Sequence, residues 1–249
     1  MQPHQVVSRE EWLKARKAHL KSEKALTRLR DLVSAERRVL PWVKIEKDYV
    51  FDTPEGKKRL ADLFGGNSQL IVYHFMWRWD LGQGCPSCSF VADHVDGANV
   101  HLKHHDVTFV AISRGKLADL EAYRKRLGWK FPLISSYGSD FNFDYGVSFT
   151  EEQLKGKVNY NFQLMDGKDA FNELPGISVF YKDEKGDVFH TYSSYARGLD
   201  ILLGTHNFLD LTPKGRNEDG IMGWVKRNDE YEADGKFASC CASERRGAA

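Results

Sequence analysis

The sequence predicts an α/β fold in which a central mixed sheet is flanked by helices. Residues 70–76 (LIVYHFM) are an apolar, β-branched and aromatic run, which suits a buried strand and is too short to span a membrane. Apolar runs at 107–112 and 131–134 alternate with helical patterns at 85–104 and 117–127. This alternation predicts parallel pairing with right-handed crossovers. The runs at 177–181 and 188–192, joined by a polar turn, add a hairpin.

The first long run leads through residues 77–84 to Cys85-Pro86-Ser87-Cys88, which opens the predicted helix. Pro86 suits the first helical position, where its missing N–H would find no partner in any case. Cys85 would then face unpaired backbone N–H groups and the positive end of the helix dipole, which favour thiolate over thiol. Cys88 follows on the same helical face. We therefore expect Cys85 to be a nucleophile and Cys88 the resolving thiol of a dithiol–disulfide site.

The composition narrows the class of protein further. The chain has 249 residues and a formal net charge of +1, so a nucleic-acid binder with a broad basic surface is not expected. No apolar run reaches about 18 residues, and none follows the N-terminus. We expect no membrane span, no signal peptide and a cytoplasmic location. In that reducing compartment, a Cys-x-x-Cys is more often redox-active or metal-binding than structural.

Both ends of the chain are predicted to lie outside the single main domain. Residues 8–39 form a long charged helical pattern, in which Ser8 and Glu11 make a capping box, and Pro41 follows it. We take residues 1–40 as an N-terminal helical extension. Its sparse apolar residues suit a solvated surface helix, or one stripe packed on the domain or on a second subunit, as in a homo-oligomer. Residues 232–249 are small, polar and charged, which predicts a disordered tail containing Cys240 and Cys241.

The remaining elements are shorter. Residues 43–45 and 49–51 alternate like strands, and residues 60–64 form a helical turn that two glycines end. Residues 135–172 are too rich in aromatic side chains to be disordered, so we expect an ordered insertion before the last hairpin. Residues 199–211 are the last predicted helix.

Seven segments of the chain together resemble the DUF899 family, described as thioredoxin-like and predicted to be dithiol–disulfide oxidoreductases of bacteria. These segments are residues 8–12, 40–43, 47–51, 73–76, 84–90, 135–142 and 195–200. The resemblance covers roughly residues 4–231. It implies a thioredoxin-like fold in its peroxiredoxin-type elaboration over residues 41–231, and a disulfide substrate or reductant protein as partner.

The resemblance also implies substrate-binding residues. Thioredoxin-like proteins carry a cis-proline before the strand that faces the Cys-x-x-Cys, and Pro175 occupies the matching place. We therefore expect a cis Leu174–Pro175 bond near Cys85, with backbone groups free to pair with a substrate. Gly176 departs from the pattern, because thioredoxins usually have Thr or a similar residue there.

Other side chains near the cysteines are candidates for supporting roles. His74 and Arg78 would stabilise a thiolate if they face it, although a histidine in a buried strand is more often part of the core. Trp77 and Trp79 are expected to flank the site as apolar walls or to pack in the core. Arg197 is a weaker candidate for pairing with an anion or thiolate.

Two other functions compete with the oxidoreductase, which needs no cofactor. Cys85, Cys88, His101 and His105 have the spacing of a common zinc finger. However, the segment reads as one helix and lacks the finger's apolar residues, so no metal site is assigned. A copper or zinc carrier using the two cysteines remains an alternative. So does a thiol peroxidase, although the Thr-x-x-Cys signature of peroxiredoxins is absent before Cys85.

Overall fold

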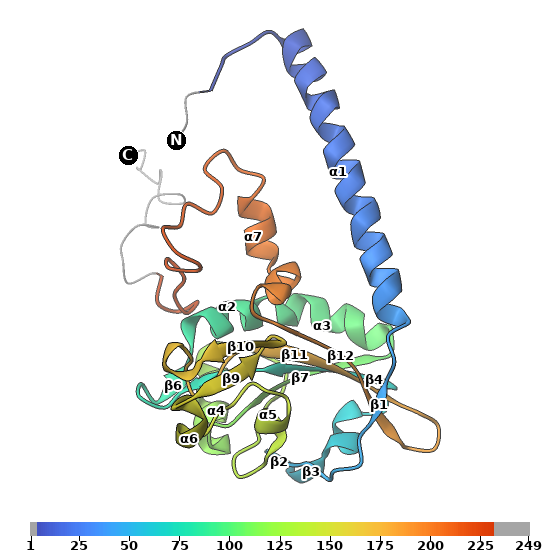
Figure 1. The fold of residues 1–249 in the computed structure, drawn as a ribbon, viewed down its shortest axis with the longest axis vertical. Coiled ribbons are helices and arrows are strands. Elements are labelled where there is room, and N and C mark those ends of the chain that lie inside the picture. The colour runs from blue at the N-terminus through green and yellow to red at the C-terminus, as the bar shows by residue number, and fades with distance from the viewer. Residues whose placement is uncertain (1–3, 232–249) are drawn as a thin grey trace, which may run out of the picture.

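A mixed sheet is the centre of the fold. The computed structural model describes residues 4–231, and within them eight strands form this sheet (Figure 1). In sheet order they are β1 (Val43–Lys44), β12 (Val188–Tyr195), β11 (Gly176–Lys182), β4 (Gln69–His74), β7 (Val107–Ser113), β8 (Leu133–Ser135), β2 (Val50–Thr53) and β3 (Gly56–Arg59). Strands β4, β7 and β8 are parallel, as predicted, and the other pairs are antiparallel.

Strand β4 lies in the middle of this sheet. Its last residue, His74, pairs with Ile112 of β7 on one side and with Gly176 of β11 on the other. The order β7-β4-β11-β12, with one parallel pair followed by an antiparallel hairpin, is that of a thioredoxin-like fold. The chain that leaves β4 therefore emerges at the centre of one sheet edge, where it begins the helix that carries the cysteines.

Helices and helical turns cover both faces of the sheet. They are α1 (Arg9–Arg38), η1 (Leu60–Phe64), α2 (Pro86–Asp93), α3 (Val95–His104), α4 (Leu117–Arg126), α5 (Phe141–Asp144), α6 (Glu151–Leu154), η2 (Gly167–Asp169), η3 (Ala196–Leu202) and α7 (Gly204–Leu209). One core cluster joins Tyr73 of β4 to residues of α2 and α4. Another joins Val72 of β4 to η1 and α5. Successive strand residues thus serve opposite layers.

Helix α1 projects away from the sheet (Figure 1). Ser8 and Glu11 form the predicted capping box, with the Ser8 N–H donating to Glu11 over 3.0 Å. No residue of the helix is buried. Near its C-terminus, the Arg37 guanidinium lies 4.7 Å from the ring centroid of Tyr192. Among the described residues, no helix is long and apolar enough to cross a membrane.

Two predicted helices are each broken by one residue. The helix expected over 85–104 is interrupted at His94, whose Nδ1 lies 2.7 Å from the carbonyl oxygen of Phe90 and whose Nε2 accepts from the Thr205 N–H. The helix expected over 199–211 is instead η3 followed by α7. Leu203 separates them with φ −96° and ψ 83°, and its side chain is fully buried. In both places a tertiary contact overrides the local helical pattern.

Short elements between the main strands were not anticipated. Besides β3, these are the hairpin of β5 (Trp77–Arg78) and β6 (Gln83–Gly84), and the pair β9 (Lys157–Tyr160) and β10 (Gln163–Asp166). The second pair lies in the insertion, which is ordered as expected. The predicted disordered tail at 232–249, with Cys240 and Cys241, lies outside the described residues.

Candidate functional site

Cys85 occupies the N-cap of α2, where the β5–β6 hairpin meets the helix. Its N–H donates to the Met76 carbonyl oxygen over 3.1 Å, and Pro86 stands at the first helical position. The Cys85 carbonyl oxygen accepts from both the N–H and the hydroxyl of Ser89, each at 2.9 Å. The cysteine backbone is thus fixed on both sides, and its sulfur points toward the unpaired N–H groups of the first helical turn.

The two thiols have opposite acidities. A hydrogen bond from the Cys88 thiol lowers the pKa of Cys85 to about 6; burial opposes this shift, and the N–H groups of Cys88 and Ser87 and the charge of Arg78 reinforce it. Burial raises the pKa of Cys88 well above its usual value, and the hydrogen bond to Cys85 acts in the same direction. Cys88 is 2% exposed. At neutral pH the pair therefore consists of one thiolate and one buried thiol.

A cavity of about 270 Å³ opens beside both cysteines. Its wall is mainly apolar, with contributions from β4, α2, η3 and the segment after α7. Its lining includes Tyr73, Met76, Val91, Pro175, Leu199, Leu203, Ile221 and Met222. Arg197 and Asp200 also line it and form an ion pair at 3.0 Å. The sequence-predicted Pro175 and Arg197 therefore do lie with Cys85 and Cys88 around one space.

The expectation of a cis-proline was wrong. No peptide bond within residues 4–231 is cis, so the Leu174–Pro175 bond is trans. The backbone around it is already paired, because the Leu174 N–H donates to Val147 and the Pro175 carbonyl oxygen accepts from the Tyr160 hydroxyl at 2.6 Å. The next residue, Gly176, has no room for a side chain, because the ring of Tyr195 would lie 2.6 Å from a Cβ at that position.

Two tyrosines that were not anticipated help to build the site. Tyr73, 1% exposed, places its hydroxyl 3.5 Å from the Cys88 carbonyl oxygen, and burial raises its pKa. Tyr160 comes from the insertion; its hydroxyl accepts from the Ala196 N–H at 3.0 Å and donates to Pro175, so it joins two sides of the cavity. The alternation of side chains along β4 could have indicated Tyr73. No local pattern indicates Tyr160.

Arg227 was also not anticipated. It is 5% exposed, and its guanidinium donates to the Gly84 carbonyl oxygen at 2.7 Å and to the Tyr123 hydroxyl at 2.9 Å. An ion pair with Glu230 at 2.9 Å completes its contacts. The C-terminal end of the described chain thus holds the peptide just before Cys85, which is a connection between residues far apart in sequence.

The other candidates lie in different places. Trp77 is 3% exposed in the core, where its ring packs on Tyr123, and its N–H donates to Glu173. Trp79 donates to the same buried carboxylate from its indole, at 3.1 Å. Neither tryptophan lines the cavity beside the cysteines. Arg78 is held by Asp80 at 2.6 Å and acts on Cys85 through its charge alone.

His74 is a core histidine. It is 1% exposed, its Nε2 lies 2.8 Å from the Ser178 hydroxyl, and its ring packs on Phe141 and Tyr145. These rings belong to the layer opposite the cysteines. Burial, and then the charge of His190, lower the pKa of His74 to about 3, so it is neutral at physiological pH. It is therefore not positioned to stabilise the Cys85 thiolate.

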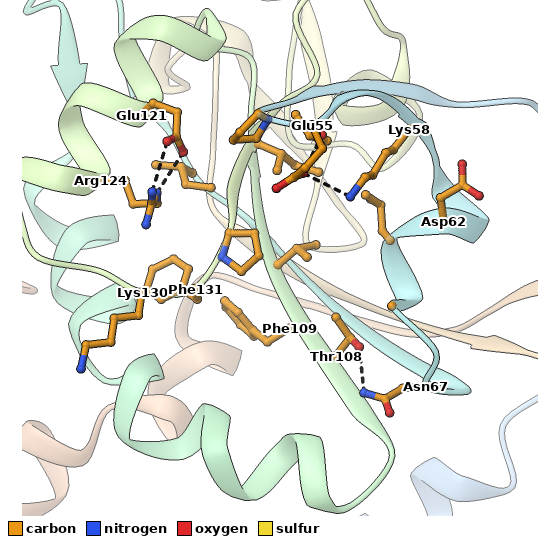
Figure 2. A pocket seen from close by; sticks show the side chains of 18 of the residues that line it. Glu55, Lys58, Asp62, Asn67, Thr108, Phe109, Glu121, Arg124, Lys130 and Phe131 are labelled. Atoms are coloured by element: carbon orange, nitrogen blue, oxygen red, sulfur yellow. Dashed lines mark hydrogen bonds and ion pairs between the residues drawn. The ribbon is translucent and has the colours of Figure 1, made fainter.

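A larger cavity, of about 580 Å³, contains no cysteine. Figure 2 shows Arg124 paired with Glu121 on one side of it, and Lys58 paired with Glu55 on the other. Asn67 donates to the Thr108 hydroxyl at its rim. No group of three or more His, Cys, Asp or Glu within residues 4–231 could hold a metal ion. The zinc-finger spacing of Cys85, Cys88, His101 and His105 thus does not bring those four side chains together.

The strand order, together with a Cys-x-x-Cys at the start of the helix after the central strand, defines a thioredoxin-like protein. Residues 1–231 match the family described as "Bacterial protein of unknown function (DUF899)". The chain belongs to this family, as the sequence segments predicted. Among curated proteins, none matches the sequence.

Solved structures with a similar arrangement include peroxiredoxin-type proteins. The bacterioferritin comigratory protein of Xanthomonas campestris has 10% identity and a TM-score of 0.43, with 63% of this chain and 88% of that chain covered. Peroxidoxin BcpB of Mycobacterium tuberculosis has 16% identity and a TM-score of 0.42, with coverages of 67% and 95%. A putative thiol:disulfide interchange protein DsbE of Chlorobium tepidum has 15% identity and a TM-score of 0.39, with 66% of this chain and 93% of that chain covered. Because these TM-scores are low, the fold assignment rests on the strand order of this chain.

Proposed function

We propose that the protein is a thiol–disulfide oxidoreductase that uses Cys85 and Cys88. The Cys85 thiolate attacks one sulfur of a substrate disulfide, a mixed disulfide forms, and the first substrate thiolate leaves and takes up a proton. Cys88 then loses its proton and attacks the Cys85 sulfur. The second substrate thiol leaves, and the protein ends as the Cys85–Cys88 disulfide. An external dithiol reductant, either a protein or a small molecule, restores the two thiols.

The opposite acidities of the two thiols carry this proposal. The pKa of about 6 at Cys85 gives a thiolate at neutral pH, and burial keeps Cys88 protonated until the mixed disulfide removes the negative charge beside it. Only four cysteines occur in the whole chain, which suits the reducing cytoplasm as the proposed compartment.

A thiol peroxidase is the second candidate, because the same activated thiolate faces a cavity. The thiolate would attack a hydroperoxide, releasing an alkoxide or hydroxide and leaving a sulfenic acid. Condensation with the Cys88 thiol would release water and give the same disulfide. A carrier of copper or zinc would have the two cysteines as its protein ligands.

Variant proteins separate these functions. Mild oxidation should give a Cys85–Cys88 bridge by peptide mass mapping, and free thiols at both positions after oxidation would contradict the dithiol mechanism. Cys88→Ser should accumulate a mixed disulfide with the substrate, whereas Cys85→Ser should be inactive. A reduced protein that reacts faster with hydroperoxides than with every disulfide would favour the peroxidase. Metal bound one-to-one after purification, without thiol turnover, would favour the carrier.

A further inference from the structure

We propose that the substrate is a small apolar disulfide held inside the cavity beside Cys85, and not a polypeptide laid along strand β11. The proposal rests on the oxidoreductase function and names its substrate class. It comes from the shape and composition of the cavity, from the state of the backbone next to Pro175, and from the chain that covers the site.

The cavity has the chemistry of an apolar ligand site. Its volume of about 270 Å³ is near the small end of ligand pockets, which run from about 300 to 1,000 Å³. Cys85 and Cys88 both line it, and Val91, Leu199 and Leu203 provide buried apolar walls. Transfer of apolar groups from water to such walls favours binding, and each added CH₂ strengthens it. A short alkyl or aryl group on the substrate sulfur is therefore stabilised where Cys85 attacks.

Three backbone positions beside the site are already paired within the protein. A bound polypeptide would pair with free N–H and carbonyl groups. Here the Leu174 N–H donates to Val147, and the Pro175 carbonyl oxygen accepts from the Tyr160 hydroxyl. Gly176 is already paired with both β4 and β12. Recognition through main-chain hydrogen bonds would first have to break these contacts.

The chain that covers the cavity is also tied down. The Tyr160 hydroxyl accepts from the Ala196 N–H at the start of η3. Leu199 of η3 and Leu203, the residue after η3, are 3% and 0% exposed, so their side chains hold this segment in the core. Asp200 pairs with Arg197 and with Arg216, at 3.0 and 3.4 Å. This fixed cover leaves a bounded space beside the sulfurs, which fits a small molecule better than a folded protein loop.

The experiment compares two disulfides of nearly equal size. Reduced protein is mixed in single turnover with dipropyl disulfide or with bis(2-hydroxyethyl) disulfide, and the released thiol and the Cys85–Cys88 bridge are both measured. The same two rates are measured with free glutathione, which corrects for the intrinsic reactivity of each disulfide. We expect the protein to prefer the dipropyl compound by about tenfold over glutathione's own preference, because the walls favour a methyl over a hydroxyl. Insulin should react much more slowly than either.

Two matched variants locate the preference. Ile221 lines the cavity and is 74% exposed, whereas Ile201 is 61% exposed and does not line it. Ile221→Gln should lose part of the preference, and Ile201→Gln should keep all of it. Alkylation of Cys85 by iodoacetamide should be equal in both, which shows that the thiolate is intact.

The possible failures are distinct. If disulfides oxidise the pair but the two compounds react in the same ratio as with glutathione, the substrate class is wrong and the proposed function stands. Faster reduction of insulin than of dipropyl disulfide would also show that the substrate class is wrong. An unchanged preference in Ile221→Gln would lead to the same conclusion. If no disulfide oxidises Cys85 and Cys88, the proposed function itself fails.

Discussion

The guanidinium of Arg227 donates a 2.7 Å hydrogen bond to the carbonyl oxygen of Gly84, the residue immediately before Cys85. A second guanidinium nitrogen, Nε, donates to the Tyr123 hydroxyl, which itself lies 3.4 Å from the same carbonyl oxygen. Arg227 is buried, so these contacts are shielded from water. Arg227 therefore holds the peptide that precedes Cys85.

Replacement of Arg227 by Met tests this role, because Met keeps an apolar stem and removes every donor. The free energy of unfolding should fall by about 2 kcal/mol in urea titrations, since buried hydrogen bonds to a charged group are lost. Thiol–disulfide exchange should also slow, because the Gly84–Cys85 peptide is released. Arg126→Gln is the control: Arg126 pairs with Asp229 and Glu230 of the same segment and contacts the Gln83 side chain, but it does not bond to the Gly84 carbonyl oxygen. Equal exchange rates in the two variants would show that Arg227 only secures the C-terminal segment.

The acidity of Cys85 predicts a specific pH profile for its alkylation. A pKa lowered to about 6 means that the thiolate forms as pH rises through 6, and that the rate is nearly constant above pH 7. A free cysteine would reach half of its maximum rate near pH 8.5. Iodoacetamide labelling, followed on the peptide that contains Cys85, measures the midpoint.

The Cys88 thiol is the largest cause of that lowered pKa. Cys88→Ala removes the donor, so the midpoint for Cys85 should move up toward that of a free cysteine. Cys88→Ser keeps an O–H donor and should retain more of the shift. Midpoints unchanged from the wild type in both variants would mean that the helix N-terminus, and not Cys88, sets the acidity.

The buried His74 predicts a pH-dependent stability that does not involve the two cysteines. Its pKa is about 3 in the fold, whereas an unfolded histidine has a pKa near 6.5. Between these values the unfolded chain binds one more proton, so stability is complete above pH 6.5 and falls as pH decreases toward 3. The loss attributable to His74 should be about 2 kcal/mol between pH 6.5 and 5.

Urea unfolding of His74→Phe should therefore show a shallower fall over that range than the wild type. His101→Gln, at an exposed position of α3, should fall as steeply as the wild type. Because His74 faces away from the cysteines, the midpoint for Cys85 alkylation should not move in either variant. A shift of that midpoint in His74→Phe would contradict the position of the side chain.

Gly176 predicts a cost for any side chain at the residue after Pro175. An added Cβ would lie 2.6 Å from the ring of Tyr195 and 3.1 Å from Val147. Gly176→Ala should lower the free energy of unfolding by about 1–3 kcal/mol, because the core is overpacked. Gly97→Ala is the matched control, since no atom lies within 4 Å of its added Cβ; in helix α3 it should be neutral or slightly stabilising. Thermal denaturation of both variants measures the difference.

The order of the main strands and helices and the place of the cysteines could be predicted from residue patterns alone. The apolar run at 70–76 and the Pro86 that follows Cys85 encode a buried strand and a helix start through local chemistry, and both were found where expected. The parallel pairing of β4, β7 and β8 also followed, because a helix between two strands leaves few other connections. The capping box of Ser8 and Glu11 is likewise a local signal, and it was confirmed.

Which side chains meet the cysteines depends on how distant segments of the chain pack together. A strand sends neighbours to opposite faces, so Tyr73 reaches Cys88 whereas His74 is buried in the other layer. The Leu174–Pro175 bond is trans, and the backbone on its two sides is hydrogen-bonded to Val147 and Tyr160, which come from the insertion. The hydrogen bond of Arg227 to Gly84 joins the C-terminal segment to the reactive loop. No local pattern encodes such contacts, because they depend on how distant segments pack and not on the preferences of the residues themselves.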